Sequence, residues 1–162
     1  MKRPIIGVIG TGNSTPALDT LAREVGREIA RCGAILVCGG LGGVMEAAAA
    51  GAKEVGGTTV GILPGSGVED ANPYIDVPIA TNMGQARNAV IVHTADVLIA
   101  VDGEYGTLSE MAMALKIGKP VIALKPRFSI PEVVVMEHPR EAVEKAISAL
   151  GECGTSFLGD QS

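Results

Sequence analysis

Short apolar runs rich in valine and isoleucine alternate with helical patterns along the whole chain, and this alternation constrains the fold most. The runs predict strands at 5–9, 34–38, 58–63, 76–80, 97–101, 120–124 and 133–137. The segments between them predict helices at 15–31, 43–55, 84–94, 107–117 and 139–150. Strands that alternate with helices pair in parallel through right-handed crossovers. The pattern therefore predicts an α/β fold with a doubly wound, Rossmann-like parallel sheet.

Composition is consistent with one layered domain over residues 1–162. Hydrophobic residues make up 47% of the chain and aromatic residues only 2%, so alanine, valine, isoleucine and leucine must fill the core. Such a core suits a parallel sheet covered by helices on both faces. No linker or internal repeat divides the 162 residues. At the first helix, Thr15 followed by Pro16 predicts the start and Gly33 the stop.

Charge and cysteine content exclude several classes of protein. The net charge of −5, without a cluster of Lys or Arg, argues against a nucleic-acid partner. No apolar run is long enough to span a membrane, and the N-terminal residues carry no secretory signal, so we expect a cytoplasmic location. The three cysteines, Cys32, Cys38 and Cys153, predict no disulfide framework, and Cys38 is interpreted as a small buried residue. Neither histidine has partners for a metal site.

Three predicted strands run into glycine-rich turns: the first turn (10–14), the second turn (39–43) and the third turn (102–107). Where a turn opens a helix, free backbone N–H groups and the helix dipole favour a bound phosphate. Parallel strands would bring the turns to one edge of the sheet. The candidate ligand-binding residues are Gly10, Thr11, Gly12, Asn13, Gly39, Gly40, Gly42, Gly43, Gly103, Glu104, Tyr105, Gly106 and Thr107.

The common nucleotide fingerprints are incomplete in this chain. The first turn begins like a dinucleotide motif but has Thr15 in place of the third glycine. The strand at 34–38 ends without an acidic residue for a ribose, which disfavours NAD and FAD. The lysine-containing phosphate loop of ATPases is also missing. The stretch 64–74 is either a plain surface loop or a cover for the ligand site.

Arg87 and Glu110 each allow two interpretations. Thr107-x-x-Glu110 is a capping-box pattern, in which Thr107 caps the helix and Glu110 reaches back. Alternatively, Glu110 lies one turn into the helix beside a bound ligand. Arg87 is either a solvated helix residue or a ligand contact, because the turn before it should also reach the ligand edge of the sheet.

The turns resemble those of the LOG and lysine-decarboxylase-like superfamily. The matching segments are Gly39-Gly40-Leu41-Gly42-Gly43-Val44-Met45, Met83-Gly84-Gln85-Ala86-Arg87-Asn88 and Asp102-Gly103-Glu104-Tyr105-Gly106-Thr107-Leu108-Ser109-Glu110. The superfamily includes phosphoribohydrolases that release cytokinin bases from nucleoside 5′-monophosphates. The resemblance, from the first strand to the sixth, implies catalytic Arg87 and Glu110, a nucleotide contact at Met83 and, for a hydrolase, no required cofactor.

A sister branch, the molybdenum cofactor carrier proteins, is similar in length and over the segment 43–65. Such carriers bind a phosphorylated pterin without transforming it, and the resemblance implies the same role for this chain. In this chain Asn88 replaces the lysine of the enzymes, Asp102 replaces a proline, and Glu104 replaces a glycine of the phosphate turn. Retention of Arg87 and Glu110 favours the enzyme, whereas the three replacements favour the carrier.

We therefore expect the chain to bind a small phosphorylated, nucleotide-like ligand at the carboxyl edge of the sheet. One hypothesis is hydrolysis of a nucleoside 5′-monophosphate to base and ribose 5-phosphate, with Glu110 stabilising or attacking the sugar centre. The other is a carrier or sensor that releases the molybdenum cofactor or a nucleotide unchanged. Both branches imply a homodimer or homotetramer. Met83, Met111 and Met113 either form a contact surface for it or simply fill the core.

Overall fold

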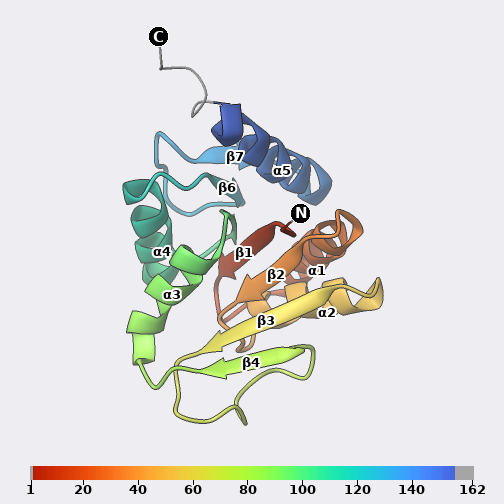
Figure 1. Cartoon of the computed structure of the whole chain (residues 1–162), viewed down its shortest axis with the longest axis vertical. Helices are drawn as coiled ribbons and strands as arrows, with labels where there is room; N and C mark the ends of the chain where they lie inside the picture. The colour runs from red at the N-terminus through yellow and green to blue at the C-terminus, as the bar shows by residue number, and fades with distance from the viewer. Residues whose placement is uncertain (1, 156–162) are drawn as a thin grey trace.

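The computed structural model describes residues 2–155, which form a seven-stranded sheet of order β4-β3-β2-β1-β5-β6-β7 (Figure 1). All neighbouring strands pair in parallel. The strands are β1 (Ile5–Gly10), β2 (Ile35–Cys38), β3 (Thr58–Leu63), β4 (Val77–Ala80), β5 (Val97–Val101), β6 (Val121–Leu124) and β7 (Val134–Met136). The predicted doubly wound sheet is confirmed, with strand ends within one residue of the predicted ranges.

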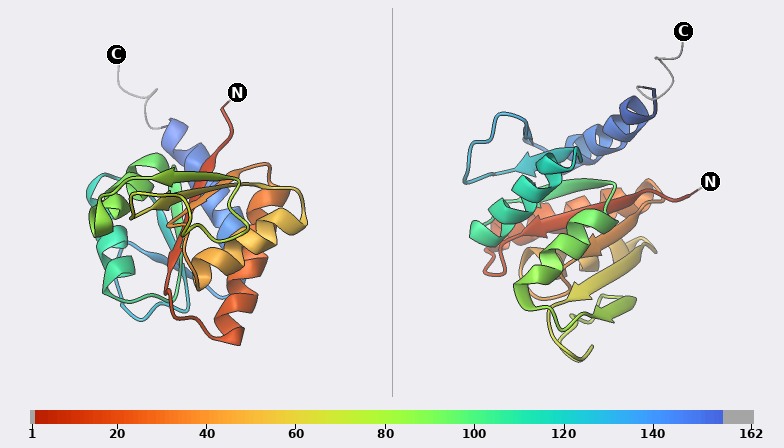
Figure 2. Two further views of the ribbon diagram at one scale, coloured as in Figure 1. Left: turned by 90° about the horizontal axis from the view of Figure 1, so that it is seen from below. Right: turned by 60° about the vertical axis from the view of Figure 1, so that its left-hand side comes forward.

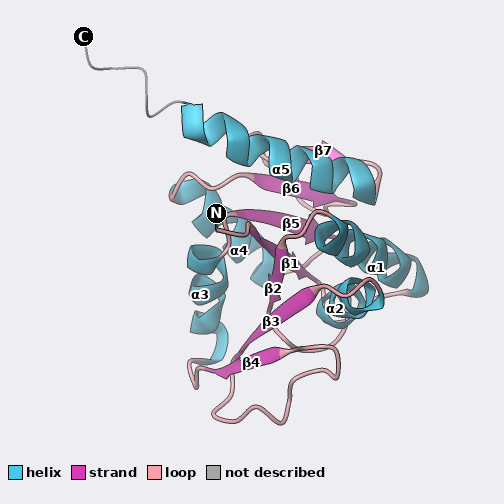
Figure 3. Cartoon of the chain, turned by 45° about the vertical axis from the view of Figure 1, so that its right-hand side comes forward, coloured by secondary structure: helices cyan, strands magenta, loops and turns pink. Residues whose placement is uncertain are grey.

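Helices cover both faces of this sheet (Figure 3). One face carries α1 (Pro16–Arg31), α2 (Val44–Glu54) and α5 (Pro139–Thr155). The other carries a short 3-10 helix (Gly84–Ala86), α3 (Arg87–Thr94) and α4 (Tyr105–Lys116). The left panel of Figure 2 shows the two groups on opposite sides of the strands. The core is split likewise, because successive strand residues such as Val8 and Ile9 point to opposite faces.

The ends of α1 follow the sequence signals. The Thr15 hydroxyl oxygen accepts a hydrogen bond from the Leu18 N–H at 3.3 Å, and Pro16 occupies the first helical position. Gly33, just past the helix, has a φ of +74°, a conformation that glycine adopts without steric cost. Both predicted boundaries of α1 are confirmed.

The order of the strands determines where a ligand can bind. From the central β1 the chain winds outward through β2, β3 and β4, and then returns to place β5 on the other side of β1. Gly10 pairs with Val101, so β1 and β5 end side by side. The chain leaves these two strands toward opposite faces of the sheet. Such a divergence opens a crevice at the carboxyl ends of the strands.

Three expectations from the sequence concern membrane-spanning helices, clusters of metal ligands and the state of the cysteines within residues 2–155. Within them, no helix is both long and apolar enough to cross a membrane. They also contain no cluster of three or more potential metal ligands from His, Cys, Asp and Glu. Cys38 is buried as interpreted, and burial raises the pKa of its thiol to about 11. The side chain of Cys153 lies outside the part that is described.

The methionines near the site divide between core and surface. Met111 is 2% exposed and belongs to the core cluster under α3 and α4, whereas Met83 is 47% exposed. Met113 packs against the same cluster while partly exposed. Core filling therefore accounts for Met111, and the homodimer or homotetramer stays a prediction.

Helices α1 and α2 touch backbone to backbone at two glycines. A Cβ added at Gly26 would lie 1.9 Å from the Ala48 carbonyl oxygen. At Gly51 it would lie 1.9 Å from the Arg23 carbonyl oxygen. Because neither contact leaves room for a methyl group, these glycines set how closely α2 approaches α1.

We expect Gly26→Ala to destabilise the fold by at least about 1–3 kcal/mol, because overpacked helices must separate. The matched control is Gly151→Ala in α5, where an added Cβ meets nothing within 4 Å. That change should stabilise the protein by roughly 0.5–1 kcal/mol through the higher helix propensity of alanine. Urea unfolding of both variants measures the difference, and equal effects would contradict the close packing of α1 on α2.

Candidate functional site

A cavity of about 450 Å³ opens at the crevice between β1 and β5. Its walls come from the first and second turns, the start of α4, the region around the 3-10 helix and the apolar end of β1. The lining residues are Val8, Ile9, Gly10, Thr11, Gly12, Asn13, Gly39, Leu41, Met45, Pro64, Gln85, Arg87, Asn88, Ile91, Glu104, Tyr105, Gly106, Thr107 and Glu110. The structure thus brings together most of the residues that the sequence nominates.

Five nominated residues lie outside the cavity lining: Gly40, Gly42, Gly43, Gly103 and Met83. Two of them have clear structural roles. A Cβ on Gly43 would lie 2.4 Å from the Thr11 carbonyl oxygen, so the second turn packs directly on the first. Gly103 has a φ of +123°, and a Cβ there would lie 2.5 Å from the Thr107 Cβ. These glycines pack against Thr11 and Thr107, which line the cavity, without lining it themselves.

The third turn differs from its prediction at the start of α4. The helix begins at Tyr105, and its N-cap is Glu104, whose backbone is extended (φ −108°, ψ −155°). Thr107 is therefore inside the first turn and buried, and Glu110 lies a further turn along. The capping-box interpretation of Thr107 and Glu110 is wrong, because Thr107 lies three residues past the N-cap position that a capping box requires it to occupy.

The start of α4 faces the cavity without a side-chain cap from the described residues. The first bond within the helix runs from the Leu108 N–H to the Glu104 carbonyl oxygen, at 2.9 Å. The N–H groups of residues 105–107 therefore have no partner inside the helix. A Cβ on Gly106 would meet nothing within 4 Å, so the approach to these groups is open. The arrangement has the geometry of an anion site at a helix N-terminus.

Two carboxylates lie close to this helix start and are paired with Arg127. Asp102 has a φ of +52°, which aspartate tolerates better than most residues. Arg127 donates from Nε to Asp102 Oδ1 at 2.8 Å and from Nη2 to Asp102 Oδ2 at 3.2 Å. Its Nη1 lies 3.8 Å from Glu104 Oε1. Arg127 thus balances the negative charge at the cavity mouth, a role that no sequence signal indicated.

Arg87 is bonded into the floor of the cavity. Its Nε donates to the Ile62 carbonyl oxygen at 2.8 Å, and its Nη2 to the Gly39 carbonyl oxygen at 3.4 Å. Nη1 donates to Oδ1 of the adjacent Asn88. The guanidinium therefore joins the ends of β2 and β3 while still lining the cavity. The solvated-face interpretation of Arg87 does not apply.

Glu110 is 7% exposed and lines the same cavity floor. Burial raises the pKa of its carboxyl to about 8, although the nearby Arg87 opposes this rise. The carboxyl is therefore mostly protonated at neutral pH and can donate a hydrogen bond to a ligand. A strongly perturbed carboxyl in a cavity is a frequent mark of a functional site.

Sequence reasoning missed the apolar and amide parts of the lining. Leu41, Met45 and Gln85 stand within the segments that resemble the superfamily but were not nominated as ligand contacts, and Ile91 carried no motif. The four side chains meet only through the fold. The long loop 64–74 contributes Pro64 to the lining. Its Asn72 donates from Nδ2 to the carbonyl oxygens of Gly40 at 3.3 Å and Leu41 at 2.9 Å. This loop supports the second turn from outside and does not cover the cavity.

The fold and this cavity place the chain among the Rossmann-like α/β proteins. More particularly, it belongs to the SLOG cluster4 family, whose model matches residues 3–150. An uncharacterised protein of Archaeoglobus fulgidus is 51% identical over 149 residues, covering 92% of this chain and 98% of its own.

Two solved structures are similar over nearly their full length. The molybdenum cofactor binding protein of Rippkaea orientalis is 39% identical with a TM-score of 0.86, over 93% of this chain and 98% of that one. The molybdenum cofactor carrier protein of Chlamydomonas reinhardtii is 36% identical with a TM-score of 0.81, over 93% and 99%.

A third similarity is to an enzyme and is less extensive. The cytokinin riboside 5′-monophosphate phosphoribohydrolase of Mycobacterium tuberculosis is 37% identical over 116 residues. The match covers 65% of this chain and 62% of the enzyme, less than two thirds of its length. The predicted membership in the LOG-like superfamily, close to the carrier proteins, is confirmed.

The raised pKa of Glu110 predicts how stability depends on pH. Because the folded protein holds this proton more tightly than the unfolded chain, stability is fully retained below about pH 4.5 and declines as the pH rises toward about 8. Glu110→Gln mimics the protonated carboxyl and should remove this decline. The variant should match the parent at pH 4.5 and exceed its stability above pH 8, by an amount on the order of a few kcal/mol.

Thermal melts of both proteins between pH 4.5 and 9 measure this difference. Glu132→Gln, at an exposed position, is the matched control and should follow the parent at every pH. Parallel curves for Glu110→Gln and the parent would show that the carboxyl is ionised in the folded protein at neutral pH.

Proposed function

We propose that this protein binds a phosphorylated pterin, the molybdenum cofactor, in the cavity at the carboxyl edge of its sheet and releases it unchanged. The observation that carries the proposal is the uncapped start of α4, where N–H groups of residues 105–107 face the cavity. Such a start is suited to the phosphate of the ligand. The near full-length similarity to a cofactor binding protein and a cofactor carrier supports the choice of ligand.

The floor of the cavity also suits binding without reaction. A protonated Glu110 and the amide of Gln85 offer hydrogen bonds to the polar edge of a pterin ring. Ile91 and Met45 offer apolar contacts to its faces. Arg87 is bonded to three acceptors of the protein, so it contributes shape and charge from a fixed position. A small cavity with few converging polar groups is typical of small-molecule sites.

Gly106→Asp tests the phosphate site. The side chain has room, and an acidic residue in the first turn of a helix is favourable, so the fold should keep its stability. The new carboxylate would occupy the anion site and repel a phosphate. We expect the affinity for the phosphorylated pterin to fall about tenfold or more, as estimated for like charges a few ångströms apart.

Calorimetry or fluorescence titration under anaerobic conditions measures this affinity. The dephosphorylated pterin is the control ligand, and its weaker binding should hardly change in Gly106→Asp. Unchanged affinity for the phosphorylated form would remove the start of α4 from the binding site.

A second candidate function is hydrolysis of a nucleoside 5′-monophosphate, favoured by the state of Glu110. A carboxyl with a pKa of about 8 can act as a general acid near neutral pH and protonate the departing base. In this role Glu110 would not supply the negative charge that a nucleophile or a stabiliser of the sugar cation requires. The similarity to the Mycobacterium tuberculosis phosphoribohydrolase supports this candidate over part of the chain.

Base release separates the two candidates. The purified protein is incubated with a panel of nucleoside 5′-monophosphates, and free base is measured by chromatography. The carrier hypothesis predicts no release above the buffer blank. The hydrolase hypothesis predicts release that Glu110→Gln lowers by at least about a hundredfold, since general acid catalysis contributes about 10²–10⁴.

A further inference from the structure

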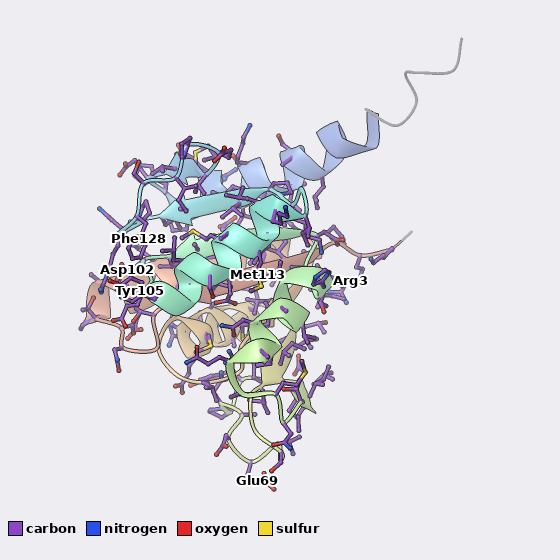
Figure 4. The ribbon with its side chains drawn as sticks, turned by 90° about the vertical axis from the view of Figure 1, so that its left-hand side faces the viewer. Arg3, Glu69, Asp102, Tyr105, Met113 and Phe128 are labelled. Atoms are coloured by element: carbon purple, nitrogen blue, oxygen red, sulfur yellow. The ribbon has the colours of Figure 1, made fainter. Side chains whose placement is uncertain are left out.

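The loop between β6 and β7, residues 125–133, is joined to the start of α4 by two separate contacts. Arg127 pairs with Asp102 through two hydrogen bonds and lies 3.8 Å from the Glu104 carboxylate. Phe128 packs against Tyr105 with ring centroids 5.8 Å apart and the rings tilted by 39°. Figure 4 shows Asp102, Tyr105 and Phe128 together at the same end of the sheet. The loop therefore lies against the start of α4, where Glu104 and Tyr105 line the main cavity.

A second hollow, of about 180 Å³, lies on this loop. It is lined by Pro126, Arg127, Phe128, Ser129, Ile130, Val133 and Val135. Arg127 and Phe128 line the hollow, whereas their respective partners, Glu104 and Tyr105, line the main cavity. The two spaces therefore adjoin at the start of α4, where the proposed phosphate site lies.

Tyr105 at this junction is 80% exposed, which is unusual for one of the few aromatic residues of a chain that is 2% aromatic. Burial in the core does not account for its position. An exposed aromatic ring held in place by a second ring is a suitable surface for a planar ligand group to stack on. Because Tyr105 is 80% exposed despite its contact with Phe128, most of its side chain is accessible to such a group.

We propose that the hollow on the β6–β7 loop is an outer subsite for a second planar group, linked through phosphate to the group in the main cavity. The proposal rests on the proposed function and extends it: the preferred ligand is a dinucleotide form of the pterin cofactor. The pterin occupies the main cavity, the pyrophosphate lies at the start of α4, and the nucleobase stacks on Tyr105 and Phe128.

The junction offers a separate contact for each phosphate of a pyrophosphate. The N–H groups of residues 105–107 can donate hydrogen bonds to one phosphate. The half-exposed Arg127 lies close to the same helix start and can bind the second phosphate. Asp102 occupies the Nε–Nη2 edge of the guanidinium and fixes its direction, so the Nη1 side is the part that a phosphate oxygen can reach. Glu104, which is more exposed than Asp102, can turn to solvent when the ligand takes its place beside Arg127.

The test compares the molybdenum cofactor in its monophosphate form with its guanine dinucleotide form, each titrated anaerobically into the protein of 162 residues. We expect the dinucleotide to bind the parent at least about tenfold more tightly. Phe128→Leu should weaken the dinucleotide about five- to hundredfold, the range found for losing one base–aromatic stack, and leave the monophosphate nearly unchanged. Tyr105→Leu, at a ring that also lines the main cavity, should weaken the dinucleotide more than the monophosphate. Arg127→Gln should also weaken the dinucleotide more than the monophosphate.

Ile117→Ala is the matched control, because Ile117 is an exposed apolar residue at the other end of α4. It should not alter either affinity. Melting curves establish that each variant is folded. The chain has no tryptophan and two tyrosines, so quenching of tyrosine fluorescence in a Tyr74→Phe background reports directly on Tyr105.

Equal affinity of the parent for the two forms would overturn the outer subsite while leaving the proposed function intact. Equal weakening of both forms by Tyr105→Leu would overturn it too, since the ring would then serve the main cavity. A third result would also overturn it: variants of the two rings that change the molar mass of the protein in light scattering but leave the ratio of the two affinities unchanged. The rings would then form a contact between copies of the chain. If neither form binds, the proposed function fails and the outer subsite fails with it.

Discussion

The pairing of β1 with β5 is the constraint on which the rest of this structure depends. These strands end together, with Gly10 opposite Val101, yet the helices that follow them pack on opposite faces of the sheet. No helix can then cover the gap above their ends, and a cavity forms there as a consequence of chain topology. Every other feature of the site is a turn or side chain placed around that gap.

The walls of the gap are held from several directions. The close approach of α2 to α1 brings the start of α2 beneath the first turn, where Gly43 contacts the backbone of Thr11. Asn72 holds the second turn from the outer side by bonding to two of its carbonyl oxygens. Arg87 ties the ends of β2 and β3 from below. The turns are therefore preorganised by the protein, which lowers the entropic cost of binding a ligand.

Acidic residues around the proposed anion site need an explanation, and the structure gives a different one for each. Burial raises the pKa of the Glu110 carboxyl, which favours its neutral form. Asp102 stays in a bidentate pair with Arg127, and Glu104 lies within ion-pair distance of the same guanidinium. A protein with a net charge of −5 is thus compatible with the proposed site for a phosphorylated ligand. Local dipoles and pairing outweigh the overall charge at short range, because distant charges are screened by salt.

The sequence by itself determined the strands, most helix ends and the meeting of the glycine turns. Those features follow from local periodicity, caps and breakers, as at Thr15 and Gly33, together with the general rule for parallel crossovers. It also nominated Arg87 and Glu110, because their motifs are contiguous in the chain.

Only the tertiary structure decided what those residues do. The pKa of Glu110 depends on how neighbouring elements exclude water, and Arg87 bonds to Gly39, 48 positions away. The start of α4 at Tyr105 depends on the extended backbone of Glu104, which overrides the capping-box pattern. Arg127 and Phe128 carry no motif and reach the site because β6 pairs with β5 and its loop returns across the edge of the sheet. Each is a long-range contact, and local sequence patterns hold no information on such contacts.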